Sequence, residues 1–370
     1  MERLFLTIAL LLLMSCNEAA EEADVLLPAN LEYTLVQSET NPANVELQMS
    51  AENTNFFSVD FGDGSSPVEE TDGDFNYLYP QAGTYTVTIK AHATAAVFIS
   101  ATEVVTIAEL PLESVIPSEG FVSPESYAGM TMVWRDEFDG EALNTNDWTN
   151  LIGDGCPDLC GWGNEELQFY TRENTTLTEG HLIITAKRES RGGKDYTSSR
   201  LSTKGKQSFQ YGRIDIRAAL PKGQGIWPAL WMLGNNIDEV GWPASGEIDI
   251  MEMIGGNQNG RDDTVHGTVH WFGDQYASFG GSFSLPDNQI FNGKFHVFSI
   301  TWDAQSIRWY VDNEQYHVMD ITSEQLSEFR QGYYFLFNVA VGGRWPGSPD
   351  AQTSFPQHMV VDYIRVFQDN

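Results

Sequence analysis

The apolar residues of this chain fall into short runs that are separated by turn-forming residues. From Thr131 onward, alternating or continuously apolar runs are divided by Gly, Asn, Asp and Pro, which is the pattern of an all-β sandwich or jelly roll. Helical periodicity is sparse. The best helical candidate is Ser323 to Arg330, where the serine can cap one short helix. The pattern therefore predicts an all-β fold.

The same patterning separates the first part of the chain from the rest. Val59 to Ser65 is a strand that runs into a Gly/Asp turn, and Ala82 to Ile89 alternates as a half-buried strand does. The stretch 109–126 carries prolines at 111, 117 and 124, which predicts a semi-rigid linker. We expect one domain at 28–108 and a second at 127–370, which suits a chain of 370 residues.

One run in the second domain sets three acids among apolar residues: Gly246-Glu247-Ile248-Asp249-Ile250-Met251-Glu252. Side chains alternate along a strand, so Glu247 and Asp249 share a face, whereas Glu252, five residues after Glu247, would point the other way. An extra residue bulged out near Met251 restores the phase and brings Glu252 onto the acidic face. We therefore expect three carboxylates on one side of a strand whose apolar side chains fill the other side.

Three carboxylates on one face repel one another, so their pKa values must be pushed apart. A retaining glycosidase needs two carboxyl groups about 5–5.5 Å apart, one ionised and one protonated. The alternative is a surface strand whose acids only solvate one face.

Further motifs stand in order on both sides of this strand, from about Met132 to Phe367. They are Trp134-Arg135-Asp136-Glu137-Phe138-Asp139-Gly140, Gly161-Trp162-Gly163-Asn164-Glu165-Glu166-Leu167-Gln168, Tyr211-Gly212-Arg213, Gly225-Ile226-Trp227-Pro228-Ala229-Leu230-Trp231-Met232, His266-Gly267-Thr268-Val269-His270 and Val361-Asp362-Tyr363-Ile364-Arg365-Val366. With these motifs the chain resembles glycoside hydrolase family 16, and the bulged acidic strand resembles its laminarinase (endo-β-1,3-glucanase) branch. The resemblance implies a β-jelly roll, a concanavalin-like sandwich, with a substrate groove across its concave sheet. It also implies hydrolysis of a β-linked glucan.

The resemblance assigns roles to individual residues. Glu247 matches the nucleophile and Glu252 the acid/base, and Asp249 between them can hydrogen-bond the nucleophile. No cofactor is implied for catalysis. The positions that match the family's groove are Trp227, Trp231 and Trp345 as aromatic platforms, with Asn164, Arg213 and His270 as polar contacts. Any one tryptophan can instead belong to the core, and His270 can instead be a core histidine.

A structural metal is a further implication of the resemblance. Many family members hold one calcium ion away from the chemistry, and Glu137 and Asp362 fit that pattern, since calcium prefers oxygen ligands. The ion would pin the two ends of the domain together. A pair of solvated acids is the alternative.

The first domain has a resemblance of its own. Through Asp60-Phe61-Gly62-Asp63-Gly64 and Ala82-Gly83-Thr84-Tyr85-Thr86-Val87, residues 28–108 resemble the PKD domain, an Ig-like β-sandwich. Such domains mostly serve as spacers and some bind carbohydrate. We expect a spacer.

The N-terminus has the form of an export signal. Arg3 precedes the apolar run Leu4 to Met14, which is too short to span a membrane and has signal-peptide shape. Leu13-Met14-Ser15-Cys16 resembles a bacterial lipobox, which implies a signal peptide at 1–15, a lipidated Cys16, an acidic tether at 16–27 and a place at the outer membrane or cell surface. An ordinary signal peptide is the alternative.

Two cysteines remain, Cys156 and Cys160. Because an exported protein lies in an oxidising compartment, a disulfide is the simplest expectation. A zinc site would need two more ligands, and free thiols stay open.

The net charge of the chain restricts the classes of molecule that it can bind. Twenty Lys and Arg against 52 Asp and Glu give a formal net charge of −32, which repels nucleic acid and anionic membranes and favours a neutral glucan over a sulfated galactan. We expect a monomer that binds β-glucan, binds no nucleic acid and meets the membrane only through its lipid.

Three other functions stay open. A mixed-linkage β-glucanase generally lacks the inserted Met251, whereas a galactan hydrolase (agarase or carrageenase) can carry the bulged strand and differs in its tryptophan motifs. A non-catalytic surface glucan-binding protein would not need both Glu247 and Glu252.

Overall fold

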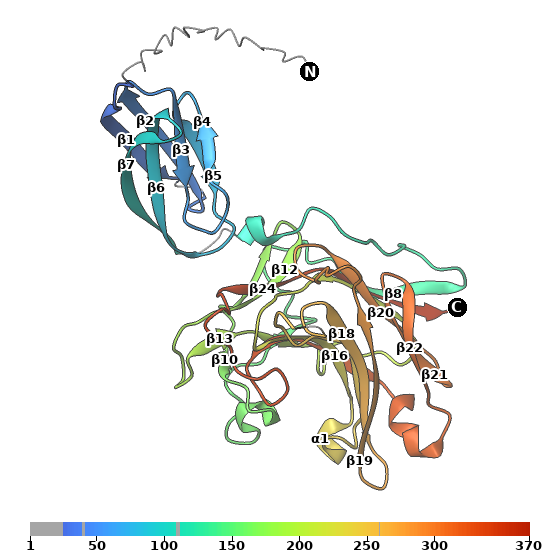
Figure 1. Cartoon of the computed structure of the whole chain (residues 1–370). Helices are drawn as coiled ribbons and strands as arrows, with labels where there is room; N and C mark the ends of the chain where they lie inside the picture. The colour runs from blue at the N-terminus through green and yellow to red at the C-terminus, as the bar shows by residue number, and fades with distance from the viewer. Residues whose placement is uncertain (1–24, 39–40, 109–111, 259) are drawn as a thin grey trace, which may run out of the picture. The chain divides into compact units, whose positions relative to one another are not determined.

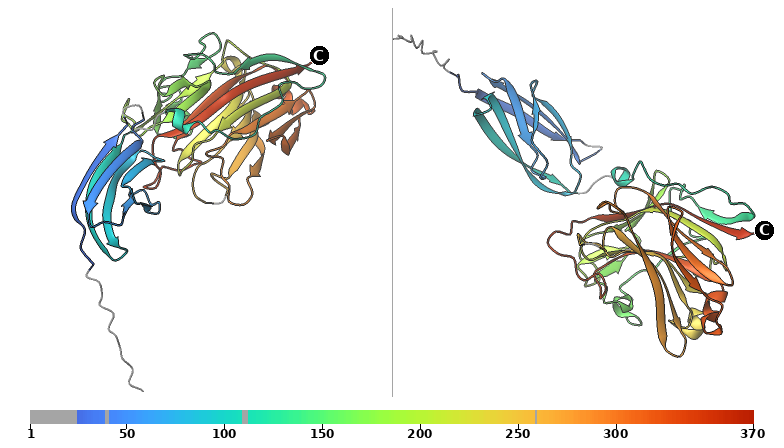
Figure 2. Two further views of the ribbon diagram at one scale, coloured as in Figure 1. Left: turned by 90° about the horizontal axis from the view of Figure 1, so that it is seen from above. Right: turned by 45° about the vertical axis from the view of Figure 1, so that its right-hand side comes forward.

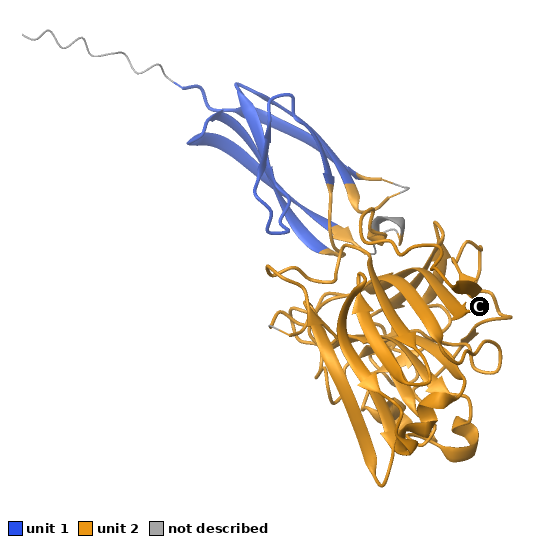
Figure 3. Ribbon diagram, turned by 90° about the vertical axis from the view of Figure 1, so that its right-hand side faces the viewer, with its two compact units in different colours: residues 1–36, 45–77, 84–105 blue, residues 37–44, 78–83, 106–370 orange. Residues whose placement is uncertain are grey.

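The computed structural model describes residues 25–38, 41–108, 112–258 and 260–370. They divide into two compact units (Figure 3). The described residues of 1–36, 45–77 and 84–105 form the first unit, and those of 37–44, 78–83 and 106–370 form the second. The expected signal peptide at 1–15, Cys16 and most of the tether lie outside the described residues.

The first unit is built only of strands, in two sheets (Figure 1). One sheet has the order β1-β2-β5 and the other β4-β3-β6-β7. The strands are β1 (Ala29–Gln37), β2 (Asn44–Glu52), β3 (Phe56–Asp60), β4 (Val68–Glu70), β5 (Asp74–Leu78), β6 (Gly83–Thr94) and β7 (Val97–Ile107). Val45, Val59, Val87 and Ile89 are fully buried, so alternate positions of these strands fill the space between the sheets.

The second unit consists of two large sheets, seen from two further sides in Figure 2. The seven-stranded sheet has the order β19-β18-β17-β16-β23-β14-β9. Its strands are β9 (Thr149–Asn150), β14 (Arg200–Ser202), β16 (Ile226–Gly234), β17 (Glu247–Glu252), β18 (Thr264–Phe272), β19 (Tyr276–Ser284) and β23 (Tyr333–Val341).

The eight-stranded sheet has the order β11-β12-β24-β15-β20-β21-β22, with β8 also paired to β24. Its strands are β8 (Met130–Asp136), β11 (Thr175–Thr178), β12 (His181–Ala186), β15 (Gly212–Ala219), β20 (His296–Trp302), β21 (Ser306–Val311), β22 (Glu314–Asp320) and β24 (Gln357–Asp369). A separate parallel pair joins β10 (Gln168–Tyr170) to β13 (Tyr196–Ser198). The prediction of an all-β sandwich is confirmed.

The helical segments among the described residues are short, with four to seven residues each. They are η1 (Leu112–Val115), η2 (Cys160–Gly163), α1 (Ile237–Val240) and η3 (Glu324–Arg330). The short helix predicted at Ser323–Arg330 forms as a 3-10 helix, and Oγ of Ser323 accepts a hydrogen bond from the backbone N–H of Gln325, as a cap does. Among the residues that the structure describes, no helix has the length and apolar character needed to cross a membrane.

One core fills the space between the two large sheets. It takes side chains from both, including Ile216, Ile300 and Val366 on one sheet and Leu230, Ile248 and Phe337 on the other. The core anchors the candidate strand, because Nε1 of Trp309 on β21 donates to the backbone oxygen of Asp249 on β17 at 2.8 Å.

The stretch predicted to be a linker is in large part docked on the second unit. Leu112, Val115 and Ile116 pack against a buried apolar cluster of that unit. Further along, the backbone N–H and Oγ of Ser123 each lie 2.8 Å from Tyr363 Oη. The linker prediction was therefore wrong for these residues, because apolar and hydroxyl side chains between the prolines have partners that composition does not reveal.

Candidate active site

The three acids lie together on β17, in the interior of the seven-stranded sheet. Against β16, Glu252 pairs with Ala229, Met251 with Leu230 and Asp249 with Trp231. The residue without a partner is therefore Ile250, and the predicted bulge is confirmed, one position before Met251. Its effect is the expected one: Glu247, Asp249 and Glu252 share one side of the sheet, which we call the acidic face.

Each of the two glutamates receives a hydrogen bond from an indole. Nε1 of Trp227 on β16 donates to Oε1 of Glu252 at 3.0 Å. Nε1 of Trp242, in the loop before β17, donates to Oε2 of Glu247, also at 3.0 Å. An N–H donor fixes the direction of a carboxyl group without adding charge, so both carboxyls are held on the acidic face.

The start of β17 depends on a glycine. Gly246 has a φ of +73°, and a Cβ there would lie 1.9 Å from Oη of Tyr333. Only glycine adopts this conformation at no steric cost and leaves room for the tyrosine. Gly246 therefore lets the backbone turn directly before Glu247.

His270 on β18 stands beside two of the acids. It pairs directly with Glu247 across the strands, and its Nε2 lies 3.7 Å from Oε1 of Glu247 and 3.2 Å from Oδ2 of Asp249. Its Nδ1 forms a hydrogen bond of 2.8 Å with Oη of Tyr276 on β19. The predicted hydrogen bond between Asp249 and the nucleophile is not seen among the described residues, where Oδ2 of Asp249 has no hydrogen-bond partner.

The electrostatics of the cluster favour bound protons. Burial, followed by the charge of Asp249, raises the pKa of Glu247 and that of Glu252 to about 8 each. Burial also holds the pKa of Asp249, which is 2% exposed, well above its usual range. His270 acts the other way and lowers the pKa of both glutamates. The cluster therefore keeps a proton at neutral pH, as a general acid requires.

The predicted tryptophans lie around the acids. Trp345, 40% exposed, meets Trp227 edge to face at 5.5 Å between ring centroids. Trp231 is half-buried on the acidic face, and its Nε1 donates to Oδ1 of Asn338 at 2.8 Å. Asn164 is exposed, and its Nδ2 donates to the buried Glu166 at 3.3 Å. The backbone carbonyl oxygen of Asn164 accepts a hydrogen bond from the backbone N–H of Arg344, so Asn164 lies next to the loop that carries Trp345.

An arginine that the motifs did not single out lies among these residues. The guanidinium of Arg200 on β14 stacks between two indoles, 4.4 Å from the ring centroid of Trp162 and 4.8 Å from that of Trp231. Its Nε is buried and has no hydrogen-bond partner. Its charge also lowers the raised pKa of Glu166.

Arg213 was predicted to contact substrate, and this prediction was wrong. Arg213 lies on β15, in the eight-stranded sheet rather than the sheet that carries the acids. Its Nε donates to Oδ1 of buried Asp215 at 2.8 Å, and its guanidinium stacks on Tyr127 at 4.4 Å. It is a structural ion pair.

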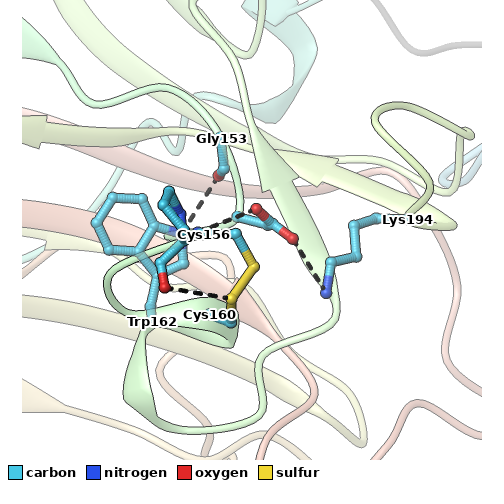
Figure 4. The surroundings of a disulfide bond; sticks show 7 residues. Gly153, Cys156, Cys160, Trp162 and Lys194 are labelled. Atoms are coloured by element: carbon cyan, nitrogen blue, oxygen red, sulfur yellow. Dashed lines mark hydrogen bonds and ion pairs between the residues drawn. A yellow bond between two sulfur atoms is a disulfide. The ribbon is translucent and has the colours of Figure 1, made fainter.

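The disulfide prediction is confirmed. Cys156 and Cys160 are joined by a bond of 2.07 Å (Figure 4). The bridged loop is tied on both sides: Nε1 of Trp162 donates to the backbone oxygen of Gly153 at 3.3 Å, and Asp154 pairs with Lys194 at 3.6 Å. The bridge therefore helps to hold Trp162, and through it Arg200.

The residues predicted to hold calcium are paired with arginines. Both carboxylate oxygens of Glu137 accept from Arg365, at 2.7 and 2.8 Å. Oδ2 of Asp362 accepts from Arg217 at 2.6 Å, and its Oδ1 lies 3.5 Å from Nε2 of His181. As arranged, these side chains do not fit a shared calcium ion, which would have to displace two guanidinium groups. Calcium binding stays a prediction, and no catalytic step below uses it.

The comparisons with known proteins agree with this geometry. Residues 162–365 match glycosyl hydrolases family 16, and residues 26–105 match the PKD domain. The laminarinase catalytic domain from Thermotoga maritima is 48% identical, with a TM-score of 0.60, over 65% of this chain and 99% of that one.

Two longer proteins are also similar. The clotting factor G alpha subunit of Tachypleus tridentatus is 39% identical over 64% of this chain, and glucan endo-1,3-beta-glucosidase A1 of Niallia circulans is 38% identical over 68%. The match spans 34% and 40% of their respective lengths. Since the family match covers more than half of the residues, the chain belongs to glycosyl hydrolases family 16.

Proposed function

We propose that the protein is a retaining endo-β-1,3-glucanase that hydrolyses laminarin-type β-glucan. The observation that carries the proposal is the bulge at Ile250, which places Glu247 and Glu252 on one face of one strand. The similarity to a laminarinase and to a glucan endo-1,3-beta-glucosidase supports the choice of linkage.

In the first step, the ionised carboxylate of Glu247 attacks the anomeric carbon while the bond from that carbon to the glycosidic oxygen breaks. Glu252 gives its proton to the departing oxygen. Burial and the charge of Asp249 raise the pKa of both glutamates to about 8, so the pair holds a proton at neutral pH. The match of Glu252 to the acid/base position, rather than a difference in pKa, assigns that proton to Glu252.

In the second step, Glu252, now a carboxylate, takes a proton from water. The water oxygen bonds to the anomeric carbon, and the ester to Glu247 breaks. Asp249, two residues from Glu247 on the same face, is placed to influence the charge of both glutamates.

Reducing-sugar release from laminarin, lichenan and agarose tests the proposal against its alternatives. We expect the highest turnover on laminarin, and a loss of about 10³-fold or more in Glu247→Gln and in Glu252→Gln. Faster release from lichenan would indicate a mixed-linkage enzyme, and faster release from agarose a galactan hydrolase. Binding of laminarin without release would indicate a glucan-binding protein.

We also propose export as a lipoprotein that places the enzyme at the outer membrane or cell surface. The Leu13–Cys16 motif and the Cys156–Cys160 disulfide, which suits an oxidising compartment, support this. Labelling with a palmitate analogue should modify the full chain and not the Cys16→Ser variant. Equal labelling of both would contradict the lipid assignment.

A further inference from the structure

Two carboxyl groups and one imidazole converge on one point of the acidic face. Glu247 and Asp249 lie on β17 and His270 lies on the neighbouring β18, and one ligand atom from each lies within 4.8 Å of the other two. Nε2 of His270 is 3.2 Å from Oδ2 of Asp249 and 3.7 Å from Oε1 of Glu247. Carboxylate oxygen and imidazole nitrogen are both ordinary ligands of zinc.

The spacing of these atoms fits a small divalent ion. A tetrahedral zinc ion has bonds of about 2.0–2.2 Å to nitrogen and oxygen, so its ligand atoms stand about 3.3–3.5 Å apart. The two distances from Nε2 of His270 bracket that value. Because His270 lies directly opposite Glu247 on two paired strands inside the sheet, the backbone places these ligands before any ion arrives.

The carboxyl group of Asp249 lacks a hydrogen bond at this point. Asp249 is 2% exposed, and its Oδ2 has no hydrogen-bond partner among the described residues. Nε2 of His270 is near enough but is not aligned for a hydrogen bond. A buried polar atom normally has a partner, so Oδ2 of Asp249 is a buried acceptor that a bound cation would satisfy.

The contacts around the cluster leave the converging atoms open to an ion. Trp242 donates to Oε2 of Glu247, which leaves Oε1. Nδ1 of His270 bonds to Oη of Tyr276 at 2.8 Å, and in the tautomer whose Nδ1 carries the proton, Nε2 has a lone pair for a metal. A metal-binding histidine is usually oriented by such a bond on its other nitrogen. The side chains of Glu247 and His270 are 16% and 19% exposed, so an ion can reach them from solvent.

We propose that Glu247, Asp249 and His270 bind a divalent transition-metal ion of the zinc type, and that this ion inhibits the enzyme. A bound ion takes the lone pair of Oε1 of Glu247 that would attack the anomeric carbon, so metal binding and catalysis exclude each other. Imidazole ligands suit zinc, copper and nickel, whereas magnesium and calcium prefer oxygen ligands. Binding of the ion is independent of the proposed function, whereas the inhibition of hydrolysis rests on it.

Calorimetry with ZnCl₂ as the titrant and tag-free protein tests the site. We expect one tight site per chain. His270→Gln and Asp249→Asn, which are close in shape to the native residues, should each weaken zinc binding by about 100-fold or more, because each removes a ligand. Tyr276→Phe keeps every ligand and loses only the bond to Nδ1, so it should weaken binding about tenfold.

His296→Gln is the matched control, since His296 pairs with Asp312 on the other large sheet. We expect it to bind zinc as the wild type does. The control is needed because a chain with a net charge of −32 attracts cations over its whole surface. Equal zinc affinities in the wild type, His270→Gln and Asp249→Asn would overturn the site, and so would the absence of tight binding by the wild type.

An activity measurement separates this inference from the proposed function. ZnCl₂ should slow the release of reducing sugar from laminarin, an equal concentration of MgCl₂ should not, and EDTA should restore the rate. Undiminished hydrolysis of laminarin at saturating ZnCl₂ would refute the inhibition and leave the proposed function standing. A wild-type protein that binds zinc through these three residues but hydrolyses no glucan would refute the proposed function alone.

Discussion

Glu247 and His270 lie directly opposite each other on β17 and β18, with Nε2 of the histidine 3.7 Å from Oε1 of the glutamate. Burial and the charge of Asp249 raise the pKa of Glu247, while His270 lowers it. His270 thus opposes the rise in the pKa of Glu247 that burial and Asp249 cause.

The first prediction concerns the pH profile of a His270→Gln variant. Since His270 lowers the pKa of Glu247, its removal should raise that pKa further, so ionisation of the nucleophile needs a higher pH and the acid limb of kcat/KM should move upward. The three carboxyls titrate as one coupled group, so the limb belongs to the cluster. His296→Gln, at a histidine paired with Asp312 on another sheet, is the control. An unchanged or lowered acid limb in His270→Gln would refute the assigned role.

The second prediction concerns stability. Because the pKa of Glu252 is raised to about 8 by burial, the folded state holds a proton that the unfolded chain releases near pH 4.3. Stability from this group is therefore complete below the unfolded pKa and declines as the pH rises toward 8.

Glu252→Gln removes this decline. We expect the Tm of Glu252→Gln to exceed that of the wild type at pH 8. For a domain of this size, each 1 kcal/mol saved by not ionising a buried carboxyl raises the Tm by about 2–4 °C. The gain should vanish near pH 4. Calorimetry at both values checks this, with Glu314→Gln at an exposed position as control. A gain of equal size at pH 4 and pH 8 would show that ionisation is not its cause.

The third prediction tests the bulge. Deleting Ile250 restores plain alternation, so Glu247, Asp249 and Glu252 stand at every second position and keep one face. Because Ile250 is buried, the deletion should cost about 2–5 kcal/mol of stability yet leave turnover well above that of Glu252→Gln.

Deleting both Ile250 and Met251 makes the opposite change. Glu252 then stands three positions after Glu247, an odd spacing that turns it toward the core, and turnover should fall to the level of Glu252→Gln. Comparable activity in the single-deletion and double-deletion variants would contradict the register of β17.

The fourth prediction concerns the docked segment before β8. A fragment of residues 112–370 should have a higher Tm than one of residues 127–370. The longer fragment keeps the bonds of Ser123 to Tyr363 and that of Arg217 Nε to the backbone oxygen of Phe121. Both should hydrolyse soluble glucan. Equal melting temperatures would mean that these contacts contribute nothing to stability.

Much of the catalytic strand was predictable because period and parity determine which face a side chain takes. The five-residue spacing from Glu247 to Glu252 required one extra residue, but parity does not say which one, and the structure places it at Ile250. The cysteine pair was predictable from the short separation of Cys156 and Cys160 together with the expectation of export.

The site predictions that failed are those that depended on which sheet a strand joins. Arg213 stands in one of the matched motifs and Arg200 in none, yet the strand of Arg213 enters the eight-stranded sheet and that of Arg200 the sheet that carries the acids. Similarly, Trp242 and Tyr276 meet only because a loop and a hairpin converge on His270. The sequence offered only a weak signal for Arg200, which is that it ends the polar run Tyr196-Thr197-Ser198-Ser199-Arg200.

The mechanism depends on Glu247 and Glu252 acting as a retaining pair on one bulged strand. The most direct test is proton NMR of the first products of laminarin hydrolysis. A carboxylate that attacks from the face opposite the leaving group, followed by water from the face opposite the carboxylate, inverts the anomeric carbon twice and returns the product to the β configuration. We expect the β-anomer to appear first and the α-anomer only later, by mutarotation. An initial α-anomer signal would mean that water attacks directly, and would contradict the mechanism built on this strand.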